Sequence, residues 1–159
     1  MKSGFPPVID QNTEILILGT LPSDKSIKAG EYYANPQNQF WKIMFAIFNN
    51  NEPIYNYSKK INLLLTNKIG LWDVMTQAER VGSLDSNIRG EVLNDFADLF
   101  EKHPKIKKLA FNGNKAFQTY LMMIEGLPQK ELISLTSTSS ANTSKTVQLK
   151  LKEWEIALK

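Results

Sequence analysis

Short runs of consecutive apolar residues predict four strands. The first, ILIL at 15–18, ends at Gly19, and similar runs occur in IGLWDVM from Ile69, in KKLAFNG ending at Gly113 and in ELISL at 131–135. Uninterrupted apolar runs of this length are typical of strands buried on both faces of a parallel sheet. Turn-forming or polar residues follow each run and mark the end of the strand.

Apolar residues spaced three or four positions apart lie between these runs and predict helices. The helical positions are Phe40, Trp41, Met44, Phe45 and Phe48; Ile88, Val92, Phe96, Leu99 and Phe100; Ala116, Phe117, Tyr120, Leu121 and Ile124; and Val147, Leu151, Trp154 and Leu158. A weaker helix is predicted at about 57–66. We expect Asn35 to cap the first of these helices, with Pro36 in its first position, and Ser86 to cap the second.

Strands that alternate with helices over one domain predict the α/β class. We expect residues 1–159 to form a single three-layer α/β/α sandwich around a central four-stranded, mostly parallel sheet. The stretch TSTSSANTS at 136–144 has the composition of a flexible linker. Its position between a predicted strand and a predicted helix favours a loop inside the domain.

The composition narrows the chemistry that the chain can carry. There is no cysteine and only one histidine, which excludes disulfides, thiol nucleophiles and cysteine-bound clusters, so we expect neither metal nor other cofactor. No apolar run is long enough for a membrane span and the first residues lack a signal-peptide pattern, so we expect a cytoplasmic protein without a membrane partner. The net charge of +3 permits a polyanionic partner but is shared by many ordinary enzymes.

Ligands of open parallel sheets bind at the carboxyl ends of the strands, which makes the loops after the predicted strands the candidate site. The first of these loops, 19–38, is unusually long and is typical of a binding loop. Asn38 at its end is expected in a first helical turn, with its amide directed back toward the cleft and Tyr33 nearby. The alternatives are that Asn38 bonds to nearby backbone and that Tyr33 covers core.

Two further features of these loops each allow two interpretations. Asp73 either reads a ligand or is a helix cap or an ion-pair partner of Arg80 or Arg89. The hydroxyls of 136–144 either bind a phosphate together with the N-terminus of the next helix, in which Lys145 is expected one turn inside, or simply keep a loop soluble.

Five stretches taken in order resemble one known family. GTLPSDKS, YYANPQNQFW, GLWDVMTQAERVGSLDSNIR, FNGNKAF and LTSTSSAN are similar to the deoxyinosine (hypoxanthine) DNA glycosylase branch of the uracil-DNA glycosylase superfamily. The resemblance runs from about Phe5 to the last helix. It implies the same sandwich fold and a monomeric repair enzyme that acts on damaged or mismatched DNA, duplex or single-stranded. Such an enzyme flips out a deaminated base, hydrolyses its bond to the sugar and leaves an abasic site.

The resemblance also implies roles for particular residues. Asn38 corresponds to the catalytic residue of the branch, Tyr33 to the aromatic residue that stacks on the base, and Asp73 to a position that reads the base edge. Backbone groups of Gly19 and Thr20 are expected at that edge as well. The residues expected to hold DNA phosphates are Ser137, Thr138, Ser139, Asn142 and Lys145.

Four positions depart from the pattern of the relatives. Leu21 stands where many members of the superfamily have a polar residue. The deoxyinosine branch also lacks a polar residue at this position. Thr136 and Ser140 replace two prolines of the last loop, which is expected to make this loop less rigid. Asn35 replaces a common histidine, so that one contact in the pocket is expected to differ.

The expected chemistry suits an amide. Breaking an N-glycosidic bond builds positive charge on the sugar and negative charge on the base, so an Asn carbonyl that orients a water is sufficient for bases that leave readily. Hypoxanthine and uracil are such bases. Two other functions remain open: a non-catalytic binder of damaged or mismatched DNA on the same fold, and a hydrolase of small-molecule nucleosides.

Overall fold

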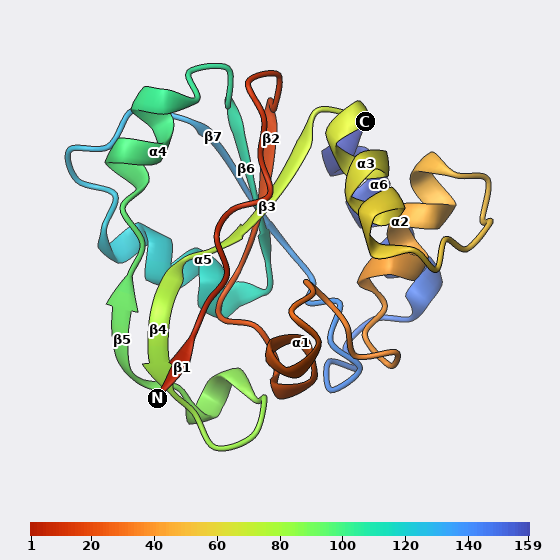
Figure 1. Ribbon diagram of the computed structural model, residues 1–159, viewed down its shortest axis with the longest axis horizontal. Helices are drawn as coiled ribbons and strands as arrows, with labels where there is room; N and C mark the ends of the chain where they lie inside the picture. Colours follow the sequence, from red (N-terminus) through yellow and green to blue (C-terminus); the bar gives the residue numbers. More distant parts are fainter.

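A computed structural model describes residues 1–159 and contains a central sheet of four parallel strands. The strands are β2 (Ile15–Gly19), β3 (Ile69–Asp73), β6 (Lys108–Asn112) and β7 (Glu131–Leu135), in the order β3-β2-β6-β7. Figure 1 shows this sheet between two layers that lie on its opposite sides. The predicted α/β sandwich and its four-stranded sheet are confirmed.

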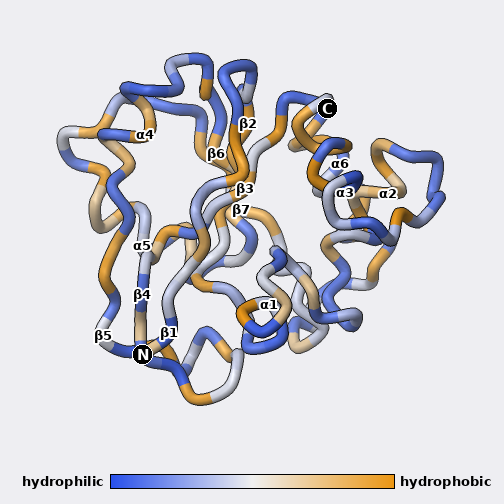
Figure 2. The backbone as a smooth tube through the Cα atoms, in the orientation of Figure 1, coloured by the Kyte–Doolittle hydropathy of each residue, from blue (hydrophilic) through white to orange (hydrophobic).

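Each face of the sheet has its own apolar core. One face packs against α2 (Phe40–Phe48), α3 (Tyr57–Thr66) and α6 (Val147–Leu158). The other packs against α4 (Phe96–Lys102) and α5 (Asn114–Met122). The hydropathy colouring in Figure 2 shows mainly apolar residues in the central strands and polar residues in most of the connecting segments. Continuous apolar runs form these strands because both of their faces are covered.

A second, antiparallel sheet of three strands adjoins the first and was not predicted. Its strands β1 (Lys2–Ser3), β4 (Met75–Glu79) and β5 (Arg89–Leu93) pair in the order β1-β4-β5. The run IGLWDVM therefore divides, because β3 ends at Asp73 and the chain enters β4 at Met75. Figure 1 shows β4 and β5 beside α4 and α5, on the face away from α2.

The helix predicted from Ser86 through Phe100 is wrong in its first half. A short 3-10 turn, η1 (Asp85–Asn87), leads into β5, and α4 begins only at Phe96, where the Asp95 side chain accepts a hydrogen bond from Asp98 N at 3.0 Å. Apolar residues in a strand that pairs with β4 happened to have helical spacing. Pairing with β4 and the left-handed Gly90 (φ 64°) override that local pattern.

Two helix starts also differ from the prediction. The segment 19–38 contains an unpredicted short helix, α1 (Asp24–Ala29), and Asn35 does not cap α2. Its Oδ1 accepts from Gln37 N at 3.0 Å and closes a turn over Pro36, so that α2 begins after Gln39. Asn38 consequently lies just before the helix rather than in its first turn.

At the other end of the chain, α6 begins after the cap Thr146, whose side chain accepts from Leu149 N at 3.2 Å. Lys145 therefore precedes this helix and is not one turn inside it as predicted. No helix of the chain has the length and apolar character that crossing a bilayer requires.

Candidate active site

A cavity of about 430 Å³ lies at the carboxyl ends of the four parallel strands. The last residues of β2, β3 and β6 and the loop after β7 contribute to it, because parallel strands end at the same edge of a sheet. Its lining includes Gly19, Thr20, Tyr33, Asn35, Asn38, Asp73, Arg80, Asp85, Asn112, Asn114, Lys115, Ser137, Thr138, Ser139 and Asn142. The candidate residues of the first loop, of the second strand and of the Ser/Thr loop, which are far apart in sequence, therefore meet around one space.

One wall of the cavity is a chain of neutral hydrogen bonds, here called the amide wall, formed by Asn38, Asn112 and Thr138. Asn112 Nδ2 donates to Thr138 Oγ1 at 2.9 Å, and Thr138 Oγ1 donates to Asn38 Oδ1 at 2.8 Å. Thr138 N returns a bond to Asn112 Oδ1 at 2.9 Å. Thr138 is fully buried, so its hydroxyl links the end of β6 to the loop before α2 and is closed to a phosphate.

The two hydrogen bonds to Asn38 determine which end of its amide is free. Oδ1 accepts from Thr138 Oγ1 and also from the backbone N–H of Phe40 at 2.9 Å, whereas Nδ2 bonds to no protein group. A backbone N–H is always a donor, which fixes the identity of the oxygen. The structure therefore offers the amide N–H groups of Asn38 to a ligand, in contrast to the expected free carbonyl oxygen.

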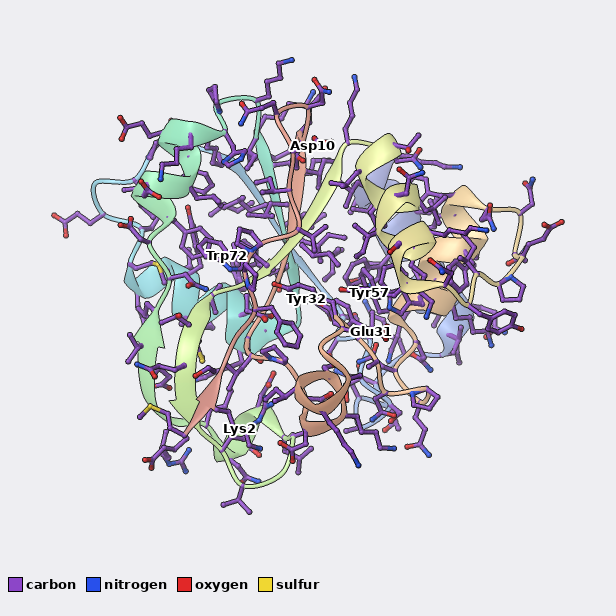
Figure 3. All side chains as sticks on the ribbon, in the orientation of Figure 1. Lys2, Asp10, Glu31, Tyr32, Tyr57 and Trp72 are labelled. Carbon is purple, nitrogen blue, oxygen red and sulfur yellow. The ribbon has the colours of Figure 1, made fainter.

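The two adjacent tyrosines point in different directions. Tyr32 is buried, and its Oη donates to Pro6 O at 3.0 Å. Its backbone N–H donates to Tyr57 Oη at 3.0 Å; both tyrosines are labelled in Figure 3. Tyr33 has a left-handed backbone (φ 55°), which turns its side chain the other way. Its ring stacks on Phe40 with 4.0 Å between centroids, so that one aromatic face has a rigid support.

The Tyr33 hydroxyl lies close to Asn112 and Gly19 at the cavity. Its Oη accepts from Asn112 Nδ2 at 3.2 Å, which connects the ring to the amide wall. A Cβ added to Gly19 would lie 3.3 Å from this Oη and 2.7 Å from Asp73 Oδ1. Gly19 is therefore needed for the close approach of these two side chains. Burial raises the pKa of the Tyr33 phenol, which stays a neutral hydroxyl.

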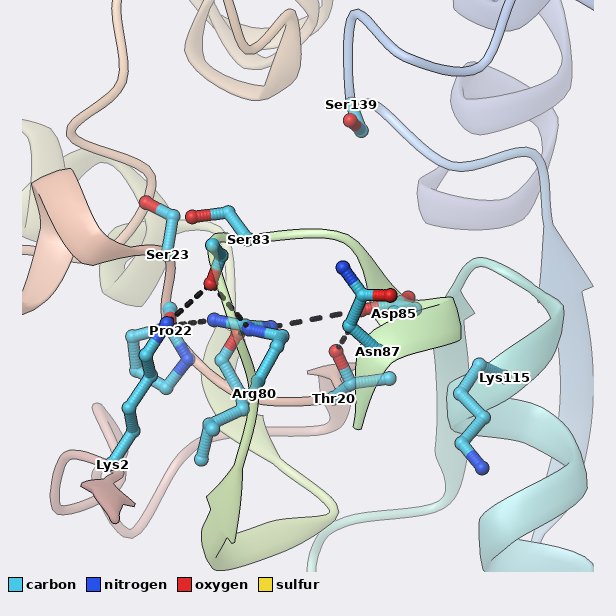
Figure 4. Close-up of polar contacts among 12 residues, drawn as sticks. Lys2, Thr20, Pro22, Ser23, Arg80, Ser83, Asp85, Asn87, Lys115 and Ser139 are labelled. Carbon is cyan, nitrogen blue, oxygen red and sulfur yellow. Dashed lines mark hydrogen bonds and ion pairs between the residues drawn. The ribbon is translucent and has the colours of Figure 1, made fainter. Parts of the chain in front are cut away.

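The opposite wall carries charge and is here called the acid wall, formed by Asp73, Arg80 and Asp85. Arg80 Nε donates to Gly82 O at 3.2 Å, and its terminal nitrogens donate to Leu21 O and Pro22 O. Figure 4 shows Arg80 beside Pro22, with a dashed contact toward Asp85. Arg80 Nη1 also lies 3.8 Å from Asp85 Oδ1. Its hydrogen-bonding capacity is thus directed at groups other than Asp73.

Asp73 is neither the helix cap nor the ion-pair partner that were its alternatives. It ends β3, is only 5% exposed, and its Oδ2 is buried without any hydrogen-bond partner. Arg89 instead donates to the carbonyl oxygens of Ser86 and Ile88. Burial raises the pKa of Asp73 to about 7, against the opposing attraction of Arg80.

Thr20 belongs to the acid wall by its side chain. Thr20 Oγ1 donates to Asp85 Oδ1 at 2.7 Å, a contact drawn in Figure 4. Asp85 therefore has two partners, Thr20 and Arg80, whereas Asp73 beside them has none on Oδ2. The carboxyl of Asp73 is the acid of this wall that is left for a ligand.

Side chains of α6 hold the Ser/Thr loop in place where prolines are missing. Glu153 accepts from the backbone N–H and from Oγ1 of Thr136, the latter at 2.9 Å, and it pairs with Lys145. The fully buried Lys150 donates to Asn142 O at 2.8 Å and to Gln39 Oε1 at 3.0 Å. Thr136 thus makes two hydrogen bonds to α6 at one of the two replaced proline positions, and the lower rigidity of this loop stays a prediction.

The residues expected to contact phosphates fall into three groups. Ser137, Ser139 and Asn142 are partly exposed and line the cavity, Thr138 is buried in the amide wall, and Lys145 is exposed outside the cavity. Prediction from sequence missed a cluster that follows the third strand: Asn112, Asn114 and Lys115 all line the cavity. The signal was present in FNGNKAF, because these polar residues follow an apolar strand as Asp73 does.

The fold and the cavity define an α/β domain with a polar cavity at the carboxyl edge of a parallel sheet, lined by an aromatic ring, an amide and a buried acid. A family model, the uracil DNA glycosylase superfamily, matches residues 6–158. The chain belongs to this superfamily.

Two named relatives match nearly the whole chain. A hypoxanthine DNA glycosylase of Methanosarcina acetivorans is 44% identical over 98% of this chain and 96% of its own length. A hypoxanthine DNA glycosylase of Methanosarcina barkeri is 40% identical over 99% of this chain and 98% of its own length. A solution NMR structure from M. acetivorans, described as a candidate uracil DNA glycosylase, has a TM-score of 0.85 and 45% identity, covering 99% of this chain and 96% of that one.

Proposed function

We propose that this protein is a DNA glycosylase that hydrolyses the N-glycosidic bond of a deaminated base, hypoxanthine foremost, and leaves an abasic site. The observation that carries the proposal is the cavity, which is lined both by the unpaired amide N–H groups of Asn38 and by the ring of Tyr33 that Phe40 supports. The names of the two Methanosarcina relatives favour hypoxanthine among the deaminated bases.

The base enters the cavity by leaving the DNA stack, which costs a few kcal/mol and less when the base is mispaired. Stacking on the free face of Tyr33 returns about 1–3 kcal/mol of this cost. Phe40 supports the other face of that ring. The ring therefore needs no ordering when the base arrives, which favours binding over a mobile aromatic residue.

Asn38 acts on the water. An N–H of its amide donates to one lone pair of a water molecule and leaves the other lone pair directed at C1′ of the sugar. A strong base is not required, because a sugar that has begun to lose its base resembles an oxocarbenium ion and reacts with neutral water. The proton that the attacking water releases neutralises the departing base, so that the products are the abasic sugar hydroxyl and the free base. The bond from Thr138 to Asn38 Oδ1 fixes the orientation of the amide, so Thr138 is a positioning residue in this proposal.

The DNA backbone lies across the mouth of the cavity. Ser137, Ser139 and Asn142 offer hydroxyl and amide groups for phosphate oxygens, and Lys115 adds a cation that is 41% exposed and 3.3 Å from Glu91. Lys145 contributes from outside the cavity as an exposed cation beside the loop. We further propose that the protein acts as a monomer in the cytoplasm, where it has access to the chromosome.

The decisive experiment uses end-labelled duplexes that carry one hypoxanthine or one uracil, incubated with the purified protein in EDTA and then treated with alkali. A break at hypoxanthine that is absent with Asn38→Ala supports the full proposal. A break at uracil alone keeps the chemistry and rejects hypoxanthine as the foremost base. Retained DNA binding without a break under any pairing rejects the glycosylase and identifies a non-catalytic binder.

A further inference from the structure

Asp73 is the one buried side chain of the protein with a polar atom that lacks a hydrogen-bond partner. Its Oδ2 is buried and unpaired, the residue is 5% exposed, and it lines the cavity beside Gly19. Unpaired buried polar atoms are rare in folded proteins because each costs about 1–3 kcal/mol. A carboxyl group with an unpaired oxygen, on a residue that lines a ligand cavity, points to a ligand that bonds to this carboxyl group.

The groups that face Asp73 do not neutralise a carboxylate. Arg80, after β4, donates to the backbone carbonyls of Leu21 and Pro22 and forms an ion pair with Asp85 at 3.8 Å, and it remains the only cation of this wall. Asp85 in η1 repels a negative charge on Asp73. From the segment after α1, Tyr32 donates to Pro6 O and the Tyr33 hydroxyl accepts from Asn112 Nδ2. Burial raises the pKa of Asp73 to about 7 against the attraction of Arg80, so that a substantial share of Asp73 is the neutral acid near neutral pH.

We propose that Asp73 acts in its protonated form, donating a hydrogen bond from its carboxyl group to an acceptor atom on the edge of the bound base. This inference rests on the proposed glycosylase function and deepens it. Deaminated bases carry a carbonyl oxygen where their parents carry an amino group, and a neutral donor suits that oxygen. The same bond strengthens as negative charge collects on the departing base, whereas a carboxylate at this place repels it.

If Asp73 acts as a neutral acid, the rate of base excision decreases as pH rises. The protonated acid is abundant below the pKa of Asp73 and scarce above it, so excision falls as pH rises through about 7. With one group of this pKa, the single-turnover rate is about tenfold lower at pH 8 than at pH 6. An essential carboxylate at this position gives the opposite slope.

The test measures single-turnover excision of hypoxanthine from a duplex between pH 5.5 and 8, with wild type, Asp73→Asn and Asp73→Ala. An Asn amide keeps a hydrogen-bond donor and does not titrate. The excision rate of Asp73→Asn should therefore be the same at pH 8 as at lower pH and should not fall above pH 7. Asp73→Ala should be slow at every pH. Asp98→Asn, which removes an exposed carboxylate paired with Lys102 on α4, is the matched control and should keep the wild-type profile.

A second readout does not depend on turnover. Affinity for a duplex with a non-hydrolysable 2′-fluoro deoxyinosine should fall between pH 6 and pH 8 for wild type and stay level for Asp73→Asn. A wild-type rate that rises through pH 7, or the same fall in wild type and Asp73→Asn in both assays, overturns the inference while the glycosylase stands. Absence of excision by wild type at every pH overturns the proposed function and this inference with it.

Discussion

The two walls of the cavity differ in how completely their polar groups are satisfied. In the amide wall, Asn38 Oδ1 and the hydroxyl of Thr138 have protein partners, and all the groups are neutral. In the acid wall, Arg80 and Asp85 are paired, but Asp73 is buried with a free oxygen. The first wall is suited to hold one geometry at any pH, and the second is suited to respond to protonation and to a ligand.

The largest effect on the excision rate should come from removing the Asn38 amide from the amide wall. Asn38→Ala should lower the single-turnover rate of hypoxanthine excision by about 100-fold or more, the usual effect of losing one preorganised polar group. Asn62→Ala, which removes an exposed amide from α3, is the matched control. Full excision of every accepted base by Asn38→Ala contradicts the proposed role.

Tyr33 lies between the walls, and its ring and its hydroxyl can be separated. Tyr33→Ala removes the stacking surface and should cost about 2 kcal/mol of transition-state stabilisation, or roughly 30-fold in rate. Tyr33→Phe keeps the ring, and Asn112 Nδ2 retains its bond to Thr138, so its rate should stay near that of wild type. Equal losses in the two variants, measured as kcat/KM, contradict a stacking role.

Asp73 of the acid wall should affect the free energy of unfolding as well as the excision rate. Because the folded-state pKa of Asp73 is raised to about 7, the unfolded chain releases this proton at lower pH than the folded protein does. The Asp73 contribution to the free energy of unfolding therefore falls as pH rises from about 4 to about 7. Asp73→Asn has no titrating group at this position, so it should not show this decrease in the free energy of unfolding.

Urea unfolding at pH 5 and pH 8 measures the effect. The stability of Asp73→Asn relative to wild type should increase between these pH values by an amount on the order of 2 kcal/mol. Asp98→Asn carries an exposed carboxyl change and should show no such increase. A difference between Asp73→Asn and wild type that does not vary with pH excludes a raised pKa for Asp73.

The smallest effect should come from the buried hydroxyl of the amide wall. Thr138→Val keeps the shape and removes the link between Asn112 and Asn38. Asn38 keeps its bond from Phe40 N, and Asn112 keeps its bonds to Tyr33 Oη and from the backbone N–H of residue 138. We expect a loss of about 1 kcal/mol and a roughly fivefold lower excision rate. Thr138→Ser retains the hydroxyl and should stay close to wild type. If the valine and serine variants excise equally well, the hydroxyl does not position Asn38.

The apolar pattern predicted the central sheet well because its strands are buried on both faces. β2 and β7 were located to within a residue from ILIL and ELISL alone. The same reasoning failed for β5, where Ile88 and Val92 have helical spacing in a segment that pairs with β4. Antiparallel strands with one exposed face carry few apolar residues, and their pairing partners decide their structure.

The candidate site divides in a similar way. The rule that ligands bind at the carboxyl ends of parallel strands was enough to nominate Asp73 and the end of the first loop, and the cavity includes both. Thr138, nominated for phosphate binding, is instead buried against Asn112 and Asn38, which are 26 and 100 positions away in sequence. Such partners are fixed only when the loops are folded against one another.

The sequence by itself determined that this chain is an α/β domain without cysteine chemistry and which loops would carry its polar groups, because strand burial and residue type are local properties. Only the tertiary structure decided which end of the Asn38 amide is free and which acid of the wall is unpaired. Hydrogen-bond saturation and desolvation depend on groups brought together from distant parts of the chain, and these two quantities set the chemistry of the site.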